Sequence, residues 1–247
     1  MRVLVATAVL VERDAVAAAF APSPTREYAI PGATLSRVAP SDGGPAVFDL
    51  LAAGVGPAAA AAATAAALTA AALDEQPSGP YDLVVSAGIG GGFQPEAPVG
   101  SLVLADEITA ADLGAETADG FVPVTELGFG AVTHRPPESL VRAVAAVTGA
   151  RTGAVLTVNT VTGSAERAAE LRRRHPRALA EAMEGFGVAE AAAAHGVPVL
   201  ELRAVSNPVG PRDRAAWRIG DALAALTGAF GKLAPALESW NPHDRTQ

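Results

Sequence analysis

Three polar side chains occupy places where chemistry could take place, and one of them, Glu184, has apolar neighbours. Glu12 and Glu184 are acids, and Asn207 is a carboxamide that follows the strand-like run from Val197 to Val205. An ionised acid among apolar residues is costly unless it is paired or hydrogen-bonded. The hydroxyls of a sugar diol would satisfy both oxygens of Glu184. Glu12 and Glu184 could instead be solvated acids at helix starts, stabilised by the helix dipole.

Other charged residues give weaker signals. Glu181, three residues before Glu184, is expected to be a solvated acid at a helix start. The run from Arg172 to Arg174 is expected to be a solvated helix face rather than a phosphate clamp. No metal site is expected, because metal-ligand spacing is absent among the four histidines, which are His134, His175, His195 and His243.

Two glycine-rich segments could accommodate a flat ligand. Residues 54–59, GVGPAA, fit the loose G-x-G-x-x-A pattern of dinucleotide sites. Such a site needs an acid at the end of the next strand, whereas the nearby acids precede that strand or lie at its start; they are Asp74, Glu75 and Asp82. A tight turn with a close helix–sheet contact is therefore favoured, and no cofactor is expected.

The second glycine-rich segment, SAGIGGGF at 86–93, is followed by Pro95 and Pro98. These prolines forbid a helix whose N-terminus is aimed at a pyrophosphate. The bare backbone could lie against a flat ligand or form a bulged turn without one.

Composition narrows the classes of function. Half of the 247 residues are hydrophobic, which allows a sizeable core and argues against disorder. The absence of cysteine excludes disulfides, thiolate catalysis and cysteine-ligated zinc. The net charge of −8 argues against a nucleic-acid partner. No apolar run is long enough for a membrane span and MRVLVAT does not resemble a signal peptide, so we expect a cytoplasmic protein.

Strand-like and helix-like segments alternate along the chain. Strands are predicted at 2–7, 81–87, 100–109, 153–160 and 197–205, and AVFDLLAAGVGP at 46–57 is predicted to be a strand that runs into a glycine turn. Helices are predicted from Glu12, over 57–73 with Pro57 first, over 164–174 with Ser164 as N-cap, over 187–195 and over 213–237. The alternation predicts a single three-layer α/β domain over 1–247, with a central mixed, largely parallel sheet flanked by helices.

Ligands of such sheets gather beyond the carboxyl ends of the strands. This rule selects four separate places: the turn up to Glu12, the glycines after Ala87, the loop 159–163, and Ser206–Asn207. All four could lie at one edge of one sheet.

Six segments, taken in order, resemble the purine nucleoside phosphorylase and nucleosidase superfamily over nearly the whole chain. They are MRVLVATAVLVERDAV, VSAGIGGGF, SLVLADEIT, GAVLTVNTVTGS, HPRALAEAMEG and VPVLELRAVSN. The Met-Glu pair followed about twenty residues later by Arg-Ala-x-Ser-Asn is the most specific of these features. Within the superfamily, VSAGIGGGF, VNTVTG and RAVSNPVGPRDR are similar to the futalosine hydrolases, nucleosidases of an alternative menaquinone pathway.

The resemblance implies a role for each matching position. Glu12 would activate the attacking water, and Met183 and Glu184 would hold the ribose of a nucleoside. The base would be lined by Gly90, Gly91, Thr160 and Val161. The resemblance also implies a homo-oligomer.

Asn207 stands where adenine-cleaving nucleosidases carry an aspartate. Cleavage of the N-glycosidic bond develops negative charge on the departing base, and the enzyme must donate hydrogen bonds to it. Adenine offers a donor at N6, whereas hypoxanthine offers the acceptor O6. A carboxamide can donate to O6 while its oxygen accepts a proton on N7. Asn207 is therefore expected to face a 6-oxopurine.

Water is favoured over phosphate as the nucleophile. The phosphorylases of this superfamily use arginines near the first strand's exit and the glycine loop. Here Arg13 is the only arginine near the exit of the first strand, and no arginine lies near the glycine loop, between Gly79 and Gly120. A phosphate dianion without guanidinium partners is hard to hold.

The expected reaction is therefore hydrolysis of futalosine to hypoxanthine and dehypoxanthine futalosine. The carboxylated aryl group of futalosine would need an apolar slot and an arginine, for which Arg212 and Arg214 are candidates. The alternatives are a 6-oxopurine nucleoside phosphorylase, a methylthioadenosine/S-adenosylhomocysteine nucleosidase and a non-catalytic nucleoside-binding protein.

Overall fold

The computed structural model describes residues 1–40, 43–73 and 79–240, so Asp74, Glu75 and His243 lie outside the described residues. The strands are β1 (Arg2–Thr7), β2 (Arg26–Ile30), β3 (Ala33–Val38), β4 (Val47–Ala52), β5 (Leu83–Gly92), β6 (Leu102–Ala110), β7 (Gly114–Thr117), β8 (Gly120–Pro123), β9 (Thr133–His134), β10 (Arg151–Thr157), β11 (Ala178–Ala182) and β12 (Val199–Pro208). The helices are α1 (Leu10–Ala18), α2 (Pro57–Leu73), α3 (Glu138–Thr148), α4 (Ala165–Arg174), α5 (Gly185–Ala194), the short 3₁₀ helix η1 (Arg214–Ala216) and α6 (Ile219–Ser239).

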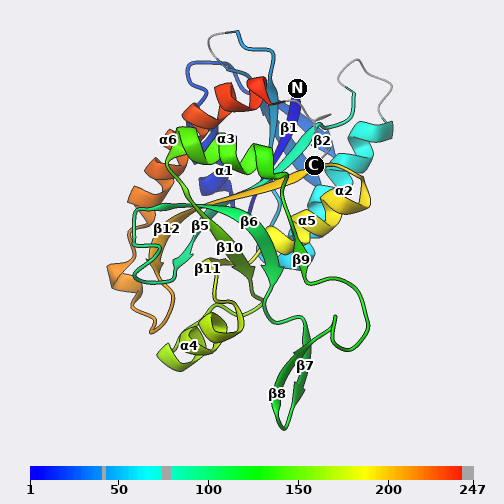
Figure 1. Cartoon of the computed structure of the whole chain (residues 1–247). Helices are drawn as coiled ribbons and strands as arrows, with labels where there is room; N and C mark the ends of the chain where they lie inside the picture. The colour runs from blue at the N-terminus through cyan, green and yellow to red at the C-terminus, as the bar shows by residue number, and fades with distance from the viewer. Residues whose placement is uncertain (41–42, 74–78, 241–247) are drawn as a thin grey trace.

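A ten-stranded mixed sheet organises most of these elements, while β7 and β8 pair with each other as a separate two-stranded sheet (Figure 1). The strand order of the large sheet is β11-β10-β6-β12-β5-β1-β4-β3-β2, with β9 beside β6. The central pairs β4–β1, β1–β5 and β5–β12 are parallel, as are β6–β10 and β10–β11, whereas β12–β6 and the β2–β3–β4 edge are antiparallel. The predicted mixed α/β sheet is confirmed.

Helices cover both faces of the sheet, which confirms the three-layer prediction (Figure 1). One apolar cluster joins α1, α3 and α6 to the sheet through residues such as Val16, Leu140 and Leu226. The cluster on the other face joins α2 and α5 through residues such as Leu68 and Val188. No helix in the described part of the chain is long and apolar enough to cross a membrane.

The sheet also curls back on itself. β11 pairs in parallel with β10 and, on its other side, antiparallel with the end of β5, so that Ala180 lies opposite Gly92 and Glu181 opposite Gly91. The five strands β5, β12, β6, β10 and β11 thus close into a ring. A Cβ on Gly90 would lie only 2.8 Å from the carbonyl oxygen of Glu181, so glycine is needed where β11 approaches β5.

Local sequence signals account for several element boundaries. Pro57 begins α2 as predicted, after a turn in which Gly54 and Gly56 have φ of 93° and 90°. The predicted cap Ser164 is confirmed, because its Oγ accepts from the backbone N–H of Arg167 at 3.1 Å. Residues 54–56 therefore form the tight turn that the sequence favours, and residues 57–59 begin α2.

Other boundaries differ from the predictions. β5 continues through the glycines to Gly92 rather than ending at Ala87, because both of its neighbours, β12 and β11, pair with it there. The last long helix begins at Ile219, and residues 213–217 form a turn with η1 because the side chain of Asp213 caps that turn through the N–H of Ala215. The strands β2, β3, β7, β8, β9 and β11 and the helix α3 were not predicted.

Candidate active site

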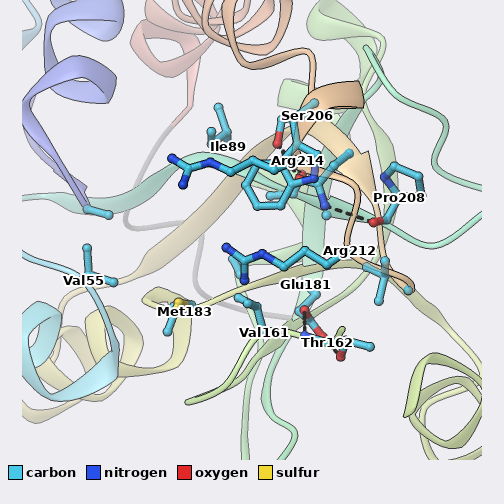
Figure 2. A pocket seen from close by; sticks show the side chains of 18 of the residues that line it. Val55, Ile89, Val161, Thr162, Glu181, Met183, Ser206, Pro208, Arg212 and Arg214 are labelled. Atoms are coloured by element: carbon cyan, nitrogen blue, oxygen red, sulfur yellow. Dashed lines mark hydrogen bonds between the residues drawn. The ribbon is translucent and has the colours of Figure 1, made fainter. Parts of the chain in front are cut away.

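A cavity of about 510 Å³ lies beyond the carboxyl ends of β1, β5, β11 and β12 (Figure 2). Seven of the predicted site residues line it, namely Glu12, Gly90, Gly91, Val161, Met183, Glu184 and Asn207. The eighth, Thr160, is exposed and does not line the cavity, whereas Thr162 from the same loop does. The cavity brings together residues that are almost two hundred positions apart in the sequence.

Glu12 is held by backbone donors at the start of α1. Its Oε2 accepts from the N–H groups of Ala8 and Val9 at 3.0 and 3.3 Å, and its Oε1 accepts from the N–H of Ile89 at 2.9 Å. The residue is only 4% exposed. Burial raises the pKa of Glu12, against the opposing effects of the Ile89 N–H and the guanidinium of Arg203. A raised pKa suits a carboxylate that must accept a proton.

Glu184 lies immediately before α5 and is 6% exposed. Its carboxylate accepts from the N–H groups of Gly56 and Met183, both at 3.3 Å, and its Oε2 lies 3.4 Å from Nη1 of Arg203. All three contacts are longer than a usual N–H···O hydrogen bond. The carboxylate therefore keeps capacity to accept hydrogen bonds from a ligand in the cavity.

Arg203 joins the two acids. It is completely buried, and its Nε and Nη2 donate to Glu201 and Ser86 at 2.9 and 2.8 Å. A Cβ placed on Gly88 would lie 2.6 Å from Oε1 of Glu12 and 2.8 Å from Nη1 of Arg203. The third donor group of the arginine therefore faces both Glu12 and Glu184.

Arg203 belongs to the Arg-Ala-x-Ser-Asn segment, but no role was predicted for it. Glu201 and Arg203 are two residues apart in an otherwise apolar strand, and that spacing puts both side chains on one face. A charged pair with this spacing in a buried strand is a signal of an internal ion pair. Burial raises the pKa of Glu201, whereas the charge and hydrogen bond of Arg203 lower it.

Asn207 follows a bulge in β12. The register with β5 shifts between Val205 and Asn207, so Ser206 is the extra residue. The Oγ of Ser206 donates to Oδ1 of Asn207 at 2.8 Å, and Nδ2 of Asn207 donates to the Pro208 carbonyl at 3.0 Å. A carboxamide has two N–H donors and two acceptor positions. One donor and one acceptor of Asn207 thus remain for a ligand.

The prediction that Glu181 is a solvated helix acid is wrong. Glu181 lies in β11, is 5% exposed and lines the cavity. Its carboxylate accepts from the backbone N–H of Thr162 at 2.8 Å and from the Thr162 hydroxyl (Figure 2). Burial raises the pKa of Glu181, against these two hydrogen bonds. The same contacts draw Thr162 inward and leave Thr160 outside.

The arginine run at the end of α4 is only partly solvated. Arg172 donates to Glu96 at 2.8 Å and remains substantially exposed. Arg174, in contrast, stacks on the ring of Phe121 at 4.4 Å and donates to the Ala111 carbonyl at 3.0 Å. In the described part of the chain, no group of three or more histidines and acids is placed to hold a metal ion.

Comparisons with known proteins agree with this geometry. The chain is 77% identical over 245 residues to the futalosine hydrolase of Streptomyces coelicolor, covering 99% of this chain and all of that protein. It is 47% identical over 161 residues to the futalosine hydrolase of Acidothermus cellulolyticus, covering 63% of this chain and 66% of that protein.

A solved structure has the same fold. The native structure of futalosine hydrolase from Helicobacter pylori superposes with a TM-score of 0.78 at 17% identity, covering 95% of this chain and 97% of that one. The profile of the phosphorylase superfamily matches residues 11–236. This stretch contains every residue that lines the cavity except Ala8 and Val9. The chain therefore belongs to the phosphorylase superfamily.

Proposed function

We propose that this chain is a nucleosidase that hydrolyses the N-glycosidic bond of futalosine and releases hypoxanthine. The identity of 77% to the futalosine hydrolase of Streptomyces coelicolor over almost the full chain supports the activity. The observation that carries the chemistry is the convergence of Glu12, Glu184 and Asn207 on one cavity.

The two acids have different parts in the proposed reaction. Glu12 accepts a proton from the water that attacks C1′ of the ribose, while the bond from C1′ to the base breaks and its electrons pass to the base. Glu184 accepts hydrogen bonds from the ribose hydroxyls. Arg203 lies 3.4 Å from Glu184, and its charge offsets part of the charge of both carboxylates in a buried place.

Asn207 is proposed to receive the leaving base. Its remaining N–H can donate to O6 of hypoxanthine, and its remaining acceptor position can accept a hydrogen bond from N7–H. With adenine, the N6 amino group would face the free N–H of Asn207, so that two hydrogen-bond donors would lie opposite each other. The mismatch leaves a buried group unpaired, which costs about 1–3 kcal/mol.

Phosphate is the rival nucleophile. Arg13 is engaged with Asp14 at 2.7 Å, and Arg203 is committed to its buried partners. Arg212 and Arg214 nevertheless line the cavity and carry the charge that a phosphate needs. Their presence makes phosphate dependence the decisive control.

The test is base release by the purified protein in phosphate-free buffer. Hypoxanthine should appear from futalosine faster than from inosine, and faster than adenine from methylthioadenosine. Replacing Asn207 with alanine should lower kcat/KM on futalosine by about 10- to 100-fold, since 1.4 kcal/mol corresponds to a factor of ten. A strict requirement for phosphate would instead establish a phosphorylase, and preference for methylthioadenosine would refute the role of Asn207.

We further infer a cytoplasmic homo-oligomer that serves menaquinone synthesis. The place in that pathway follows from the proposed substrate. The assembly is supported by apolar side chains beside the cavity, because Leu10, Val11 and Val55 are 58%, 54% and 57% exposed. Light scattering on the purified protein tests the assembly, and a mass equal to one chain would contradict it.

A further inference from the structure

One wall of the cavity is built by the segment between β12 and α6. Val209, Gly210, Pro211, Arg212, Arg214 and Trp217 line the cavity from this side. The segment is tied to the sheet at its two ends, where the N–H of Val209 donates to Gly92 at 2.9 Å and the N–H of Arg218 donates to Ser206 at 2.8 Å. The residues between these ties can therefore present their side chains to the cavity without being part of a strand ladder.

Arg212 and Arg214 have no acidic partner within the described residues. Asp213 lies between them in sequence, but its carboxylate accepts from the N–H of Ala215 at 3.2 Å within the local turn. The neighbouring Arg218 differs, because it pairs with Asp221 at 2.6 Å. Two guanidinium groups at one cavity without a counter-ion favour an anionic ligand.

Trp217 adds an aromatic surface to this pair. It is half-buried, and the guanidinium carbon of Arg212 lies 5.3 Å from the centre of its ring. A planar apolar group could lie on the ring while a charge on that group meets the arginines. The combination suits a carboxylated arene better than a bare inorganic anion, which has no use for an aromatic surface.

The arginine side chains extend toward the part of the cavity expected to hold the ribose. In Figure 2 the side chains of Arg212 and Arg214 extend across the cavity in the direction of Val55 and Met183, whereas Thr162 and Glu181 lie at the other side. The cavity of about 510 Å³ is in the range for ligands of drug size. It can therefore accept a substituent on the ribose in addition to the purine.

We propose that Arg212, Arg214 and Trp217 form a subsite for a carboxylated aryl group attached to the ribose of the substrate. The inference rests on the proposed nucleosidase function and specifies what distinguishes its substrate from a simple nucleoside. The aryl face packs on Trp217, and the carboxylate receives charge-assisted hydrogen bonds from the two arginines. These residues bind the substrate and take no part in bond cleavage.

The test compares futalosine with its methyl ester, which keeps the arene and removes the charge. The wild-type protein is expected to favour the acid in kcat/KM, and replacing Arg212 and Arg214 together with glutamine should reduce that preference by about 10- to 100-fold. Arg218→Gln is the matched control, since this arginine belongs to the same segment but does not line the cavity. Its preference should equal that of the wild type. All assays are done without phosphate, so a phosphate-binding role cannot produce the difference.

Two results would overturn the subsite. The double variant could keep the wild-type preference for the acid, or it could lose activity on acid and ester by the same factor. Failure of the wild type to cleave futalosine would refute the proposed function instead. The subsite is then judged by calorimetry with 3-acetylbenzoate as the probe: binding that the double variant lacks supports it, and equal titrations of both proteins refute it.

Discussion

Two buried ionic clusters in the same sheet have opposite charge balances. The Asp49 cluster consists of Arg2, Arg37, Asp49 and Tyr81, near the amino ends of β1 and β5. The acid cluster consists of Glu12, Glu184, Glu201 and Arg203, toward the carboxyl ends of the same strands and of β12. Among the described residues named here, the first cluster holds one carboxylate and two guanidiniums, and the second holds three carboxylates and one guanidinium.

The Asp49 cluster saturates its acid. Asp49 accepts from Arg37 at 2.7 and 2.9 Å, from Tyr81 at 2.8 Å and from Arg2 at 3.0 Å. Burial alone would raise the pKa of Asp49, but the hydrogen bonds from Arg37, Tyr81 and Arg2 outweigh it and lower the pKa. The cluster thus stabilises the ionised acid and ties β1, β3, β4 and the start of β5 together.

In the acid cluster, the charge of Arg203 does not fully offset the effect of burial on the carboxylates. Burial is the largest influence on both Glu12 and Glu201, and it raises their pKa values despite Arg203. One oxygen of Glu201, Oε2, has no hydrogen-bond partner within the described part of the structure. The comparison shows that a buried acid surrounded by donors is held in its ionised form, whereas buried acids with few donors have raised pKa values, as is common at functional sites.

The largest expected effect comes from removing the acid that accepts the proton. Glu12→Gln should lower kcat on futalosine by about 10²- to 10⁴-fold, the usual contribution of a general base. The measurement is hypoxanthine release, with a thermal melt to show that the variant is folded. If the substitution left base release at the wild-type level, the chain would bind nucleosides without the proposed chemistry.

The corresponding change in the other cluster should affect stability. Asp49→Asn removes the buried carboxylate to which Arg2, Arg37 and Tyr81 donate hydrogen bonds, which should lower the free energy of unfolding by about 3–5 kcal/mol. Because the pKa of Asp49 is lowered by folding, the loss should be complete at neutral pH and shrink as pH falls through the folded-state pKa. Urea unfolding at several pH values measures it.

A control is needed for the second change. Asp14→Asn removes an acid that is 62% exposed and should change stability by no more than about 0.5 kcal/mol. A loss of activity in folded Asp49→Asn protein as large as that of Glu12→Gln would contradict the division between the two clusters.

A smaller effect is expected from crowding the acid cluster. A Cβ on Gly185 would lie 2.2 Å from Oε2 of the buried Glu201, so Gly185→Ala must displace that carboxylate. Overpacking of this kind costs about 1–3 kcal/mol, measured as a lower free energy of unfolding. Gly228→Ala in α6 is the matched control, because a Cβ there meets nothing within 4 Å and should stabilise the helix by up to about 1 kcal/mol.

The smallest effect should appear in the pH dependence. Since burial raises the pKa of Glu12, kcat/KM should fall at low pH with an apparent pKa above the ordinary value for a glutamate. Glu201→Gln removes a negative charge that competes for Arg203, so the acid limb should move to lower pH. An acid limb that moves to higher pH in this variant would show that Arg203 does not act on Glu12.

Much of the fold and site follows from local sequence. Pro57, Ser164 and the apolar strands at 2–7 and 197–205 predict their elements because each signal lies within its own segment. The strand-end rule selects four places, and residues from all four line the cavity. Their roles in catalysis and binding stay predictions until the variants are assayed.

The errors arise where distant contacts decide the structure. β11, with the sequence ALAEA, contains good helix formers and becomes a strand because β10 and β5 both pair with it. Glu181 is misassigned for the same reason. The choice of Thr162 over Thr160 depends on hydrogen bonds to Glu181, a residue nineteen positions later.

The ring of β5, β12, β6, β10 and β11 also bears on how substrate range can evolve. Backbone ladders fix the positions of Gly90 and Gly91, which line the cavity, and of β11 and the bulge at Ser206. Residues 210–217 lie outside those ladders and can mutate without disturbing them. Substitutions in this one connecting segment could therefore change the specificity for the ribose substituent. The residues that the strand ladders hold in place would stay the same.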